Sequence, residues 1–185
     1  MKLKFSYDIK VFNLFKYFNF NKQILVFLTP IVVFASDLEV GFSPNNGSAD
    51  LVLKTINSAK HNICIATYSF TSKPIADALM AAKERGVDIK IVSDEKANSK
   101  KYTVVRYLAN HGFNVRLNGN YPIMHNKFIV VDNKTVETGS YNYSKNANQN
   151  AENVLVIWNN SSIASKYSSQ CDKLFNEAYP VTKSY

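Results

Sequence analysis

Residues 125–132 read HNKFIVVD and residues 139–142 read GSYN, and together they carry the most informative side chains of the sequence. The apolar run that starts at Phe128 predicts a buried strand, which a tight turn joins to a second strand. Residues two apart in a strand point to the same face, so we expect His125 and Lys127 to project together while Phe128 enters the core. This strand pair would present an imidazole beside an ammonium group.

An imidazole beside an ammonium group can form a phosphate site. The cation stabilises the phosphate oxygens, and the imidazole can attack phosphorus or transfer a proton. Ser140 and Asn142 share a side if the turn is extended, and they can donate hydrogen bonds to the same oxygens. A lone histidine on a strand is more commonly structural, so the indication depends on these neighbours occurring together.

The rest of the sequence alternates strand-like and helical runs, which is typical of an α/β fold. The predicted strands are residues 62–70, 87–92, 114–117, 128–131, 135–138 and 153–158, and the predicted helices are residues 72–86, 98–110 and 161–178. With 185 residues the chain has room for one domain, whose core needs no metal or disulfide for support. We find no repeat or linker that would divide it.

Residues 1–36 are expected to be a signal peptide. Residues 24–35 form an apolar run too short for the roughly 20 residues that span a bilayer, and Val33 and Ala35 fit the small-x-small pattern of a cleavage site. The alternative is an uncleaved membrane anchor, but two lysines interrupt the apolar zone, and a charge near the centre of a spanning helix costs about 2.5 to 3.5 kcal/mol. We therefore expect a secreted protein whose domain is residues 37–185.

The formal charge of +8 is divided equally between these two parts. Five lysines against Asp8 give +4 upstream of Asp37, and seventeen basic against thirteen acidic residues give +4 from there on. A domain charge of +4 is compatible with a phosphate ligand, but it does not single out nucleic acid.

Two cysteines are too few for a disulfide framework or a four-cysteine zinc site. Export would allow a bridge between Cys64 and Cys171. However, Cys64 lies in an apolar run and Cys171 in an apolar helical stripe, so we expect two buried thiols.

The sequence resembles a known family. His125, Lys127 and Asp132 fit the His-x-Lys-x4-Asp motif of the phospholipase D superfamily, and residues 139–142 fit the Gly-Ser-x-Asn that follows it. The similarity extends over about residues 42–175. It is closest in character to a short bacterial branch that includes a small endonuclease, the mitochondrial cardiolipin hydrolases and exported phospholipase D proteins of intracellular bacteria. The phrases that look like this branch are ATYSFT at residues 66–71 and ENVLV at residues 152–156.

The resemblance implies the phospholipase D-like fold, a single α/β domain with a mixed sheet flanked by helices. It also implies a metal-independent phosphodiesterase without a cofactor, acting through a phosphohistidine intermediate. Most phospholipases D carry two such motifs, whereas this chain has one, so a complete site would require a homodimer about a two-fold axis. One neutral His125 would attack phosphorus, and the protonated His125 of the partner would give its proton to the leaving oxygen.

The resemblance also implies roles for the remaining site residues. Lys127, Ser140 and Asn142 would bind the nonbridging oxygens, and Glu152 would orient the imidazole through its other nitrogen. Asp132 belongs to the catalytic motif, but it stands seven residues beyond His125 at a strand end, which predicts a structural carboxylate.

Three functions remain open. The favoured one is a secreted phospholipase D that cleaves the distal phosphodiester of membrane glycerophospholipids, such as phosphatidylcholine, to give phosphatidic acid. The alternative is a nonspecific endonuclease of the same mechanism, with nucleic acid as substrate. The third is a catalytically silent anion-binding or dimer-scaffold module, which no feature of the sequence favours.

Overall fold

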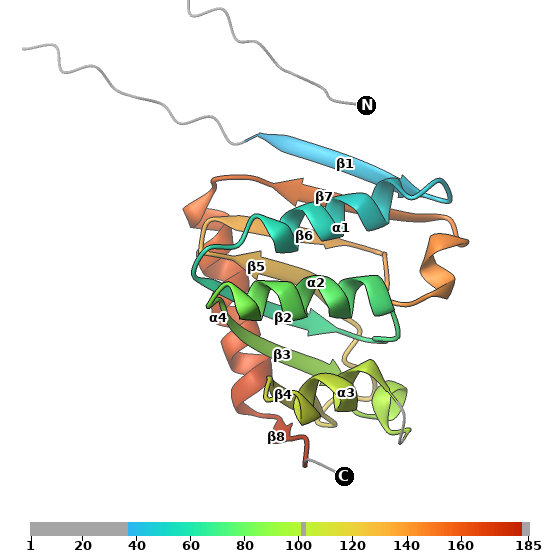
Figure 1. Cartoon of the computed structure of the whole chain (residues 1–185), viewed down its shortest axis with the longest axis vertical. Coiled ribbons are helices and arrows are strands. Elements are labelled where there is room, and N and C mark those ends of the chain that lie inside the picture. The colour runs from blue at the N-terminus through green and yellow to red at the C-terminus, as the bar shows by residue number, and fades with distance from the viewer. Residues whose placement is uncertain (1–36, 101–102, 183–185) are drawn as a thin grey trace, which may run out of the picture.

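The computed structural model describes residues 37–100 and 103–182, so the expected signal peptide at residues 1–36 lies outside the described residues. The described residues build one mixed sheet flanked by helices (Figure 1). Its strands are β1 (Leu38–Ser43), β2 (Asn62–Thr67), β3 (Asp88–Asp94), β4 (Asn114–Asn118), β5 (Lys127–Val131), β6 (Thr135–Gly139), β7 (Glu152–Ile157) and β8 (Tyr179–Pro180). The helices are α1 (Gly47–Asn57), α2 (Lys73–Glu84), α3 (Val104–Asn110) and α4 (Ser161–Asn176).

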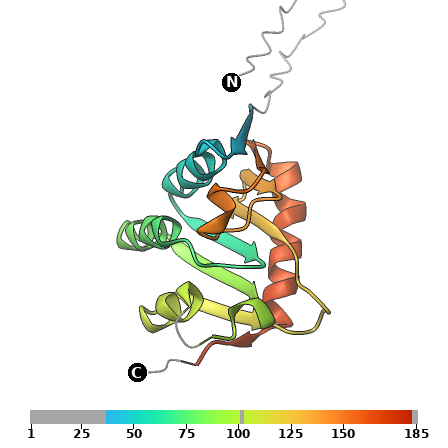
Figure 2. The ribbon, with the colours of Figure 1, turned by 90° about the vertical axis from the view of Figure 1, so that its right-hand side faces the viewer.

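The strand order is β1-β7-β6-β5-β2-β3-β4-β8. Strands β2, β3 and β4 are parallel, and the other pairings are antiparallel. Helices α1, α2 and α3 cover one face of the sheet, and α4 crosses the other face (Figure 2). The predicted α/β fold is therefore confirmed. Because β5 runs antiparallel to β2, with Lys127 opposite Thr67, the start of β5 lies at the edge where β2 and β3 end.

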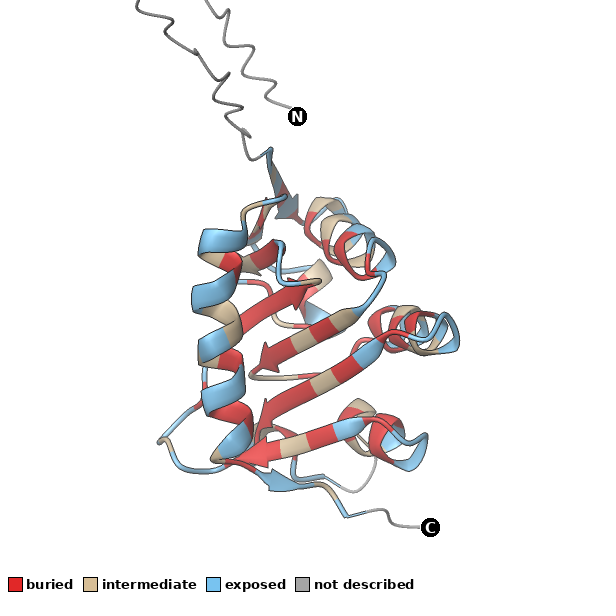
Figure 3. Ribbon diagram, turned by 90° about the vertical axis from the view of Figure 1, so that its left-hand side faces the viewer, coloured by how far each residue is buried: buried red, intermediate tan, exposed pale blue. Residues whose placement is uncertain are grey.

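Strand β5 is buried on both faces, at the centre of the sheet (Figure 3). Ile129 and Val131 belong to the core beneath α1, α2 and α3, whereas Phe128 and Val130 belong to the core beneath α4. The expected burial of Phe128 is confirmed. A strand held from both sides gives the residues at its ends a rigid support. None of the helices in the described ranges is long and apolar enough to cross a bilayer.

Helix α2 forms where the sequence predicts it. Ser72 is the N-cap, and Pro74 lies in the first turn, where its missing N–H leaves no hydrogen bond unmade. Beyond the last turn Gly86 has a φ of 86°, a left-handed conformation that glycine adopts without strain.

The predicted helix at residues 98–110 is wrong in its first half. The structure has a short 3-10 turn at Lys96–Asn98, and α3 begins only at Val104 after a cap by Thr103. The reason is Asn98, whose fully buried amide donates to two backbone carbonyl oxygens at neighbouring strand ends. These bonds tie the backbone to the sheet at the point where the helix was expected to start.

Strand β1 and helix α1 lie in a region to which the sequence pattern assigned no individual element. Leu38, Val40 and Phe42 alternate as in a strand, but all three are exposed, because β1 is an edge strand that pairs only with β7. The opposite face carries the buried Gly41 and Ser43, so the buried face of β1 has no apolar side chain and gives a weak sequence signal.

The expectation of two free thiols is also wrong, because Cys64 in β2 and Cys171 in α4 form a disulfide. Cys171 lies in the apolar core beneath α4, as predicted, whereas Cys64 is only partly buried and packs against that core. Helix α4 packs directly on β2, which brings the two Cα atoms to 6.4 Å, within the range that a disulfide spans. The bridge joins the sheet to the helix across 107 residues of sequence.

Candidate active site

His125 lies two residues before β5 begins, whereas Lys127 is the first residue of the strand. We expected both residues to belong to one strand, but only Lys127 does, because the strand begins two residues after His125. The backbone at this point is held from β3, because the buried carboxylate of Asp94 accepts a hydrogen bond from the N–H of Met124 at 2.9 Å. A second oxygen of Asp94 accepts from the N–H of Ala97 at 2.8 Å. The His125 side chain is exposed at the edge of the sheet.

The ammonium group of Lys127 lies against the backbone of the histidine. Its Nζ donates to the carbonyl oxygen of His125 at 2.8 Å, and the side chain is only 6% exposed. Burial lowers the pKa of Lys127 to about 8, and the negative charge of Glu152 acts in the opposite direction. The lysine is therefore a poorly hydrated cation, which binds an incoming anion more strongly than a fully hydrated one does.

Tyr68, which the sequence analysis did not select, completes this group. It follows the last residue of β2, and its ring lies 4.8 Å from the His125 ring between centroids, at an interplanar angle of 57°. The Nζ of Lys127 lies 5.3 Å from the centre of the same ring. The available signal was the position of Tyr68 near the end of the predicted strand at residues 62–70, but the neighbouring strand could not be identified from sequence.

Ser140 and Glu152 meet where β6 ends and β7 begins. Ser140 Oγ donates to Glu152 Oε2 at 2.6 Å and accepts from the N–H of Asn153 at 3.1 Å. Gly139 permits this approach, because a Cβ at that position would stand 2.1 Å from the carbonyl oxygen of Asn153. In the described part of the chain, the carboxylate of Glu152 accepts from Ser140 and Asn150, and it makes no hydrogen bond to the His125 ring.

Asn142 stands between two buried tyrosines. The hydroxyl of Tyr141 donates to Asn148, and that of Tyr143 donates to Glu137. Glu137 is fully buried, and burial raises the pKa of its carboxyl to about 8. The Oδ1 atom of Asn142 is buried without a hydrogen-bond partner among the described residues. The two tyrosine anchors hold the loop from both sides, so the Asn142 side chain has a restricted position.

Asp132 lies at the other end of β5, about 17 Å from the start of the strand at roughly 3.3 Å per residue. Its carboxylate accepts three backbone hydrogen bonds, from Lys60 at 2.9 Å, His61 at 2.8 Å and Asn62 at 2.9 Å. Burial opposes ionisation, but these bonds outweigh it, and the pKa of Asp132 lies below its ordinary value. The structure therefore separates Asp132 from the other motif residues and gives it a structural position.

Asp132 also shapes the turn between β5 and β6. It has a φ of 52°, and the next residue, Asn133, has a φ of 51°. Aspartate and asparagine tolerate this left-handed region better than other residues with side chains, which suits them to tight hairpin turns.

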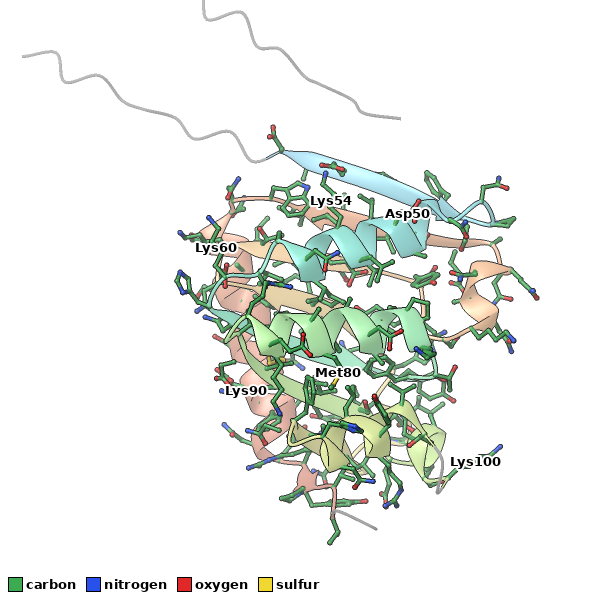
Figure 4. All side chains as sticks on the ribbon, in the orientation of Figure 1. Asp50, Lys54, Lys60, Met80, Lys90 and Lys100 are labelled. Atoms are coloured by element: carbon green, nitrogen blue, oxygen red, sulfur yellow. A yellow bond between two sulfur atoms is a disulfide. The ribbon has the colours of Figure 1, made fainter. Side chains whose placement is uncertain are left out.

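The edge that carries His125 is rich in lysine. Three exposed lysines lie there, because they follow the ends of β2, β3 and β6: Lys73, Lys96 and Lys145, respectively. Lys100 extends from the same side of the molecule, whereas Lys60 and Lys90 lie toward the opposite side (Figure 4). Within the described ranges, no three His, Cys, Asp or Glu side chains are grouped so that they would hold a metal ion.

This arrangement of residues has counterparts in known proteins. Residues 52–177 match the family described as "Cardiolipin synthase, PLD-like domain". The chain is 33% identical over 123 residues to the phospholipase D of Rickettsia bellii, an alignment that covers 66% of this chain and 61% of that protein. It is 27% identical over 143 residues to the mitochondrial cardiolipin hydrolase of Xenopus laevis, covering 77% of this chain and 68% of that protein.

A solved structure extends the likeness to the whole described domain. The crystal structure of Nuc from Salmonella typhimurium, a phospholipase D family member, matches with a TM-score of 0.77 and 43% sequence identity. The match covers 80% of this chain and 99% of that chain. The chain thus spans nearly all of Nuc, but only about three fifths of the Rickettsia bellii protein.

Proposed function

The chain belongs to the phospholipase D superfamily, and from this membership we propose that it is a phosphodiesterase with His125 as its nucleophile. The observation that carries the proposal is the grouping of His125 with Lys127 at one edge of the sheet, with Ser140 and Asn142 on the adjoining β6 and its loop. An exposed imidazole beside a buried ammonium group suits attack on a phosphodiester anion.

The reaction has two steps. A ring nitrogen of neutral His125 attacks phosphorus, and the N–P bond forms as the P–O bond to the leaving group breaks. The protonated His125 of a second copy gives its proton to the leaving oxygen. That imidazole then takes a proton from water, which attacks phosphorus and releases the first histidine. Because two imidazoles are needed and each chain supplies one motif histidine, His125, the active unit in this proposal is a homodimer with a composite site.

The other residues stabilise the charge on phosphorus. Lys127 supplies the cation, and Asn142 supplies an amide donor. The single proton of the Ser140 hydroxyl points to Glu152 in this structure, so Ser140 must rotate in order to donate to a phosphate oxygen. That rotation would free Glu152 to accept the N–H of an imidazole, which is the role proposed for this carboxylate.

The proposed substrate is a membrane glycerophospholipid such as phosphatidylcholine, cleaved at its distal phosphodiester to phosphatidic acid. The names of the phospholipase D and cardiolipin hydrolase relatives support a lipid substrate. We also propose secretion, which the signal-like residues 1–36 and the disulfide support, because disulfides persist mainly in exported proteins.

A nonspecific endonuclease is the second candidate. The lysines at the catalytic edge favour it, since exposed cations along one edge suit the backbone of a nucleic acid. Salt separates the two candidates, because a nuclease that neutralises several phosphates loses affinity steeply as the salt concentration rises. Hydrolysis of a zwitterionic headgroup should respond instead to the lipid interface.

The decisive experiment offers the purified protein phosphatidylcholine vesicles and single-stranded DNA side by side in the presence of a chelator. We expect release of phosphatidic acid, and we expect His125→Ala to abolish it. Cleavage of DNA alone would select the nuclease. Activity that survives unchanged in His125→Ala would contradict both candidates and favour a silent anion-binding module.

A further inference from the structure

We propose that Tyr68 is a positioning residue of the phosphoryl-transfer site, whose ring holds the His125 imidazole in a fixed relation to the Lys127 ammonium group. The inference rests on the proposed function, because the position of the imidazole affects turnover only if His125 is the nucleophile. Tyr68 lies outside the His-x-Lys-x4-Asp and Gly-Ser-x-Asn motifs, although it belongs to the ATYSFT stretch that resembles the short bacterial branch.

No hydrogen bond between their side chains connects His125 with Lys127. The ammonium group donates to the backbone carbonyl of His125, so this bond leaves the imidazole free to rotate. Neither ring nitrogen of His125 bonds to another residue that the structure describes. The Tyr68 ring lies close to both groups, with its centre 4.8 Å from the imidazole centroid and 5.3 Å from Nζ of Lys127.

The backbone of Tyr68 is itself firmly held. Its backbone carbonyl accepts a hydrogen bond from Nδ2 of Asn98 at 2.6 Å, and the same nitrogen donates to the carbonyl of Asp94 at 2.8 Å. Asn98 Oδ1 also accepts from the N–H of Phe70, so the amide bonds the backbone on both sides of residue 69.

The same hydrogen-bond network also holds the backbone next to the second ring, that of His125. Asp94 accepts from the N–H of Met124, the residue before His125. Asn98 therefore holds the backbone of Tyr68, and Asp94 holds the backbone next to His125. Asn98 and Asp94 are both buried and are hydrogen-bonded to each other. Two rings supported in this way keep a constant separation, and their contact limits rotation of the imidazole.

Loss of the ring should therefore affect turnover more than binding. A nucleophile that is misplaced by about 1 Å can react roughly a hundredfold more slowly. We expect Tyr68→Ala to lower kcat by about tenfold to a hundredfold, while KM changes by less than about threefold. Tyr68→Phe should keep kcat within about twofold of the wild type, because the proposal requires the ring and not the hydroxyl.

The chain offers a matched control at Tyr107. Its ring packs on His111 with 4.1 Å between centroids, at the end of α3 and outside the site. Tyr107→Ala removes the same kind of ring pair, and we expect it to leave kcat unchanged. If Tyr68→Ala fails to fold, as judged by circular dichroism, Tyr68→Leu retains apolar volume without the ring and should show the same loss of kcat.

The assay uses bis(p-nitrophenyl) phosphate, which requires no decision between lipid and nucleic acid. Nuclear magnetic resonance of the ring C–H groups gives a second readout, because the sequence has only three histidines. Tyr68→Ala should shift the His125 signals by removing the tyrosine ring current, while those of His61 and His111 stay in place. Tyr107→Ala should shift the His111 signals alone.

These outcomes separate the two proposals. If the wild type hydrolyses no phosphodiester, the proposed function fails, and the resonance shifts still decide whether Tyr68 packs on His125 in solution. Wild-type kcat in a folded Tyr68→Ala or Tyr68→Leu variant would overturn the positioning role, and so would unmoved His125 signals.

Discussion

Lys127 combines burial with a positive charge, and its ionisation should control activity at alkaline pH. Because the pKa of Lys127 is lowered to about 8, the ammonium group that binds the phosphodiester is lost as the pH rises through this value. We expect kcat/KM to fall more steeply above about pH 8 in the wild type than in Lys127→Arg, whose guanidinium stays charged. The measurement is kcat/KM from pH 6 to pH 10 for both proteins.

Deprotonation of Lys127 does not favour unfolding, so a loss of activity above pH 8 is distinct from a loss of folded protein. The folded-state pKa of Lys127 lies below the ordinary 10.5, so between about pH 8 and 10.5 the unfolded chain binds more protons than the folded one. The contribution of Lys127 therefore makes the protein more stable as the pH rises through that range. Parallel slopes for the two proteins would show that Lys127 does not act as the cation.

Asp132 should matter for stability and not for turnover. Asp132→Ala leaves three backbone N–H groups without their acceptor, and we expect a loss of about 1 to 3 kcal/mol in the free energy of unfolding. Urea denaturation measures this loss, and kcat at a temperature where the variant is folded should match the wild type. A fully folded Asp132→Ala as inactive as His125→Ala would restore Asp132 to the catalytic residues.

The sequence predicted part of this site because part of it is local. His125 and Lys127 are two residues apart, and Ser140 and Asn142 follow the end of the next strand of the same hairpin, so backbone geometry alone places them near one another. Tyr68 was missed because its proximity to His125 depends on β2 pairing with β5, a contact between residues far apart in sequence. Short-range patterns contain no information on that pairing.

At the level of elements, β2 links the disulfide to the site. Cys64 bridges this strand to α4, and Tyr68 follows the end of the same strand. We expect Cys64→Ala combined with Cys171→Ala to lower the free energy of unfolding by about 2 to 4 kcal/mol, since the bridge restricts the unfolded chain over a long loop. Denaturation of the wild type with and without a thiol reductant provides the control, and equal midpoints for bridged and unbridged protein would contradict this expectation.

The elements also show which sequence signals are dependable. Strand β5 and helix α2 were predicted because a continuous apolar run and clear end signals mark them. The first half of the helix expected at residues 98–110 failed because the buried amide of Asn98 bonds to distant backbone groups. The bridge was missed for a similar reason, since an apolar setting suits both a thiol and a disulfide until α4 is known to pack on β2.

At the scale of the whole molecule, one protomer places a single imidazole at the edge of its sheet. A mechanism that needs one nucleophilic and one acidic histidine then needs two protomers, and sedimentation analysis should find a dimer. The more specific consequence is that a dimer with one His125→Ala protomer is inactive, although its other protomer is intact.

This consequence can be measured by mixing. If wild-type and His125→Ala chains are mixed in equal amounts and exchange subunits completely by unfolding and refolding together, about a quarter of the dimers carry two histidines. We therefore expect the specific activity to fall to about a quarter of the wild-type value, against about a half if each protomer works alone. The same mixture without exchange contains only the parental dimers and should give about a half under either mechanism. Activity that stays near a half after complete exchange, verified by mass spectrometry of the intact dimers, would contradict the composite site and leave each His125 acting within its own protomer.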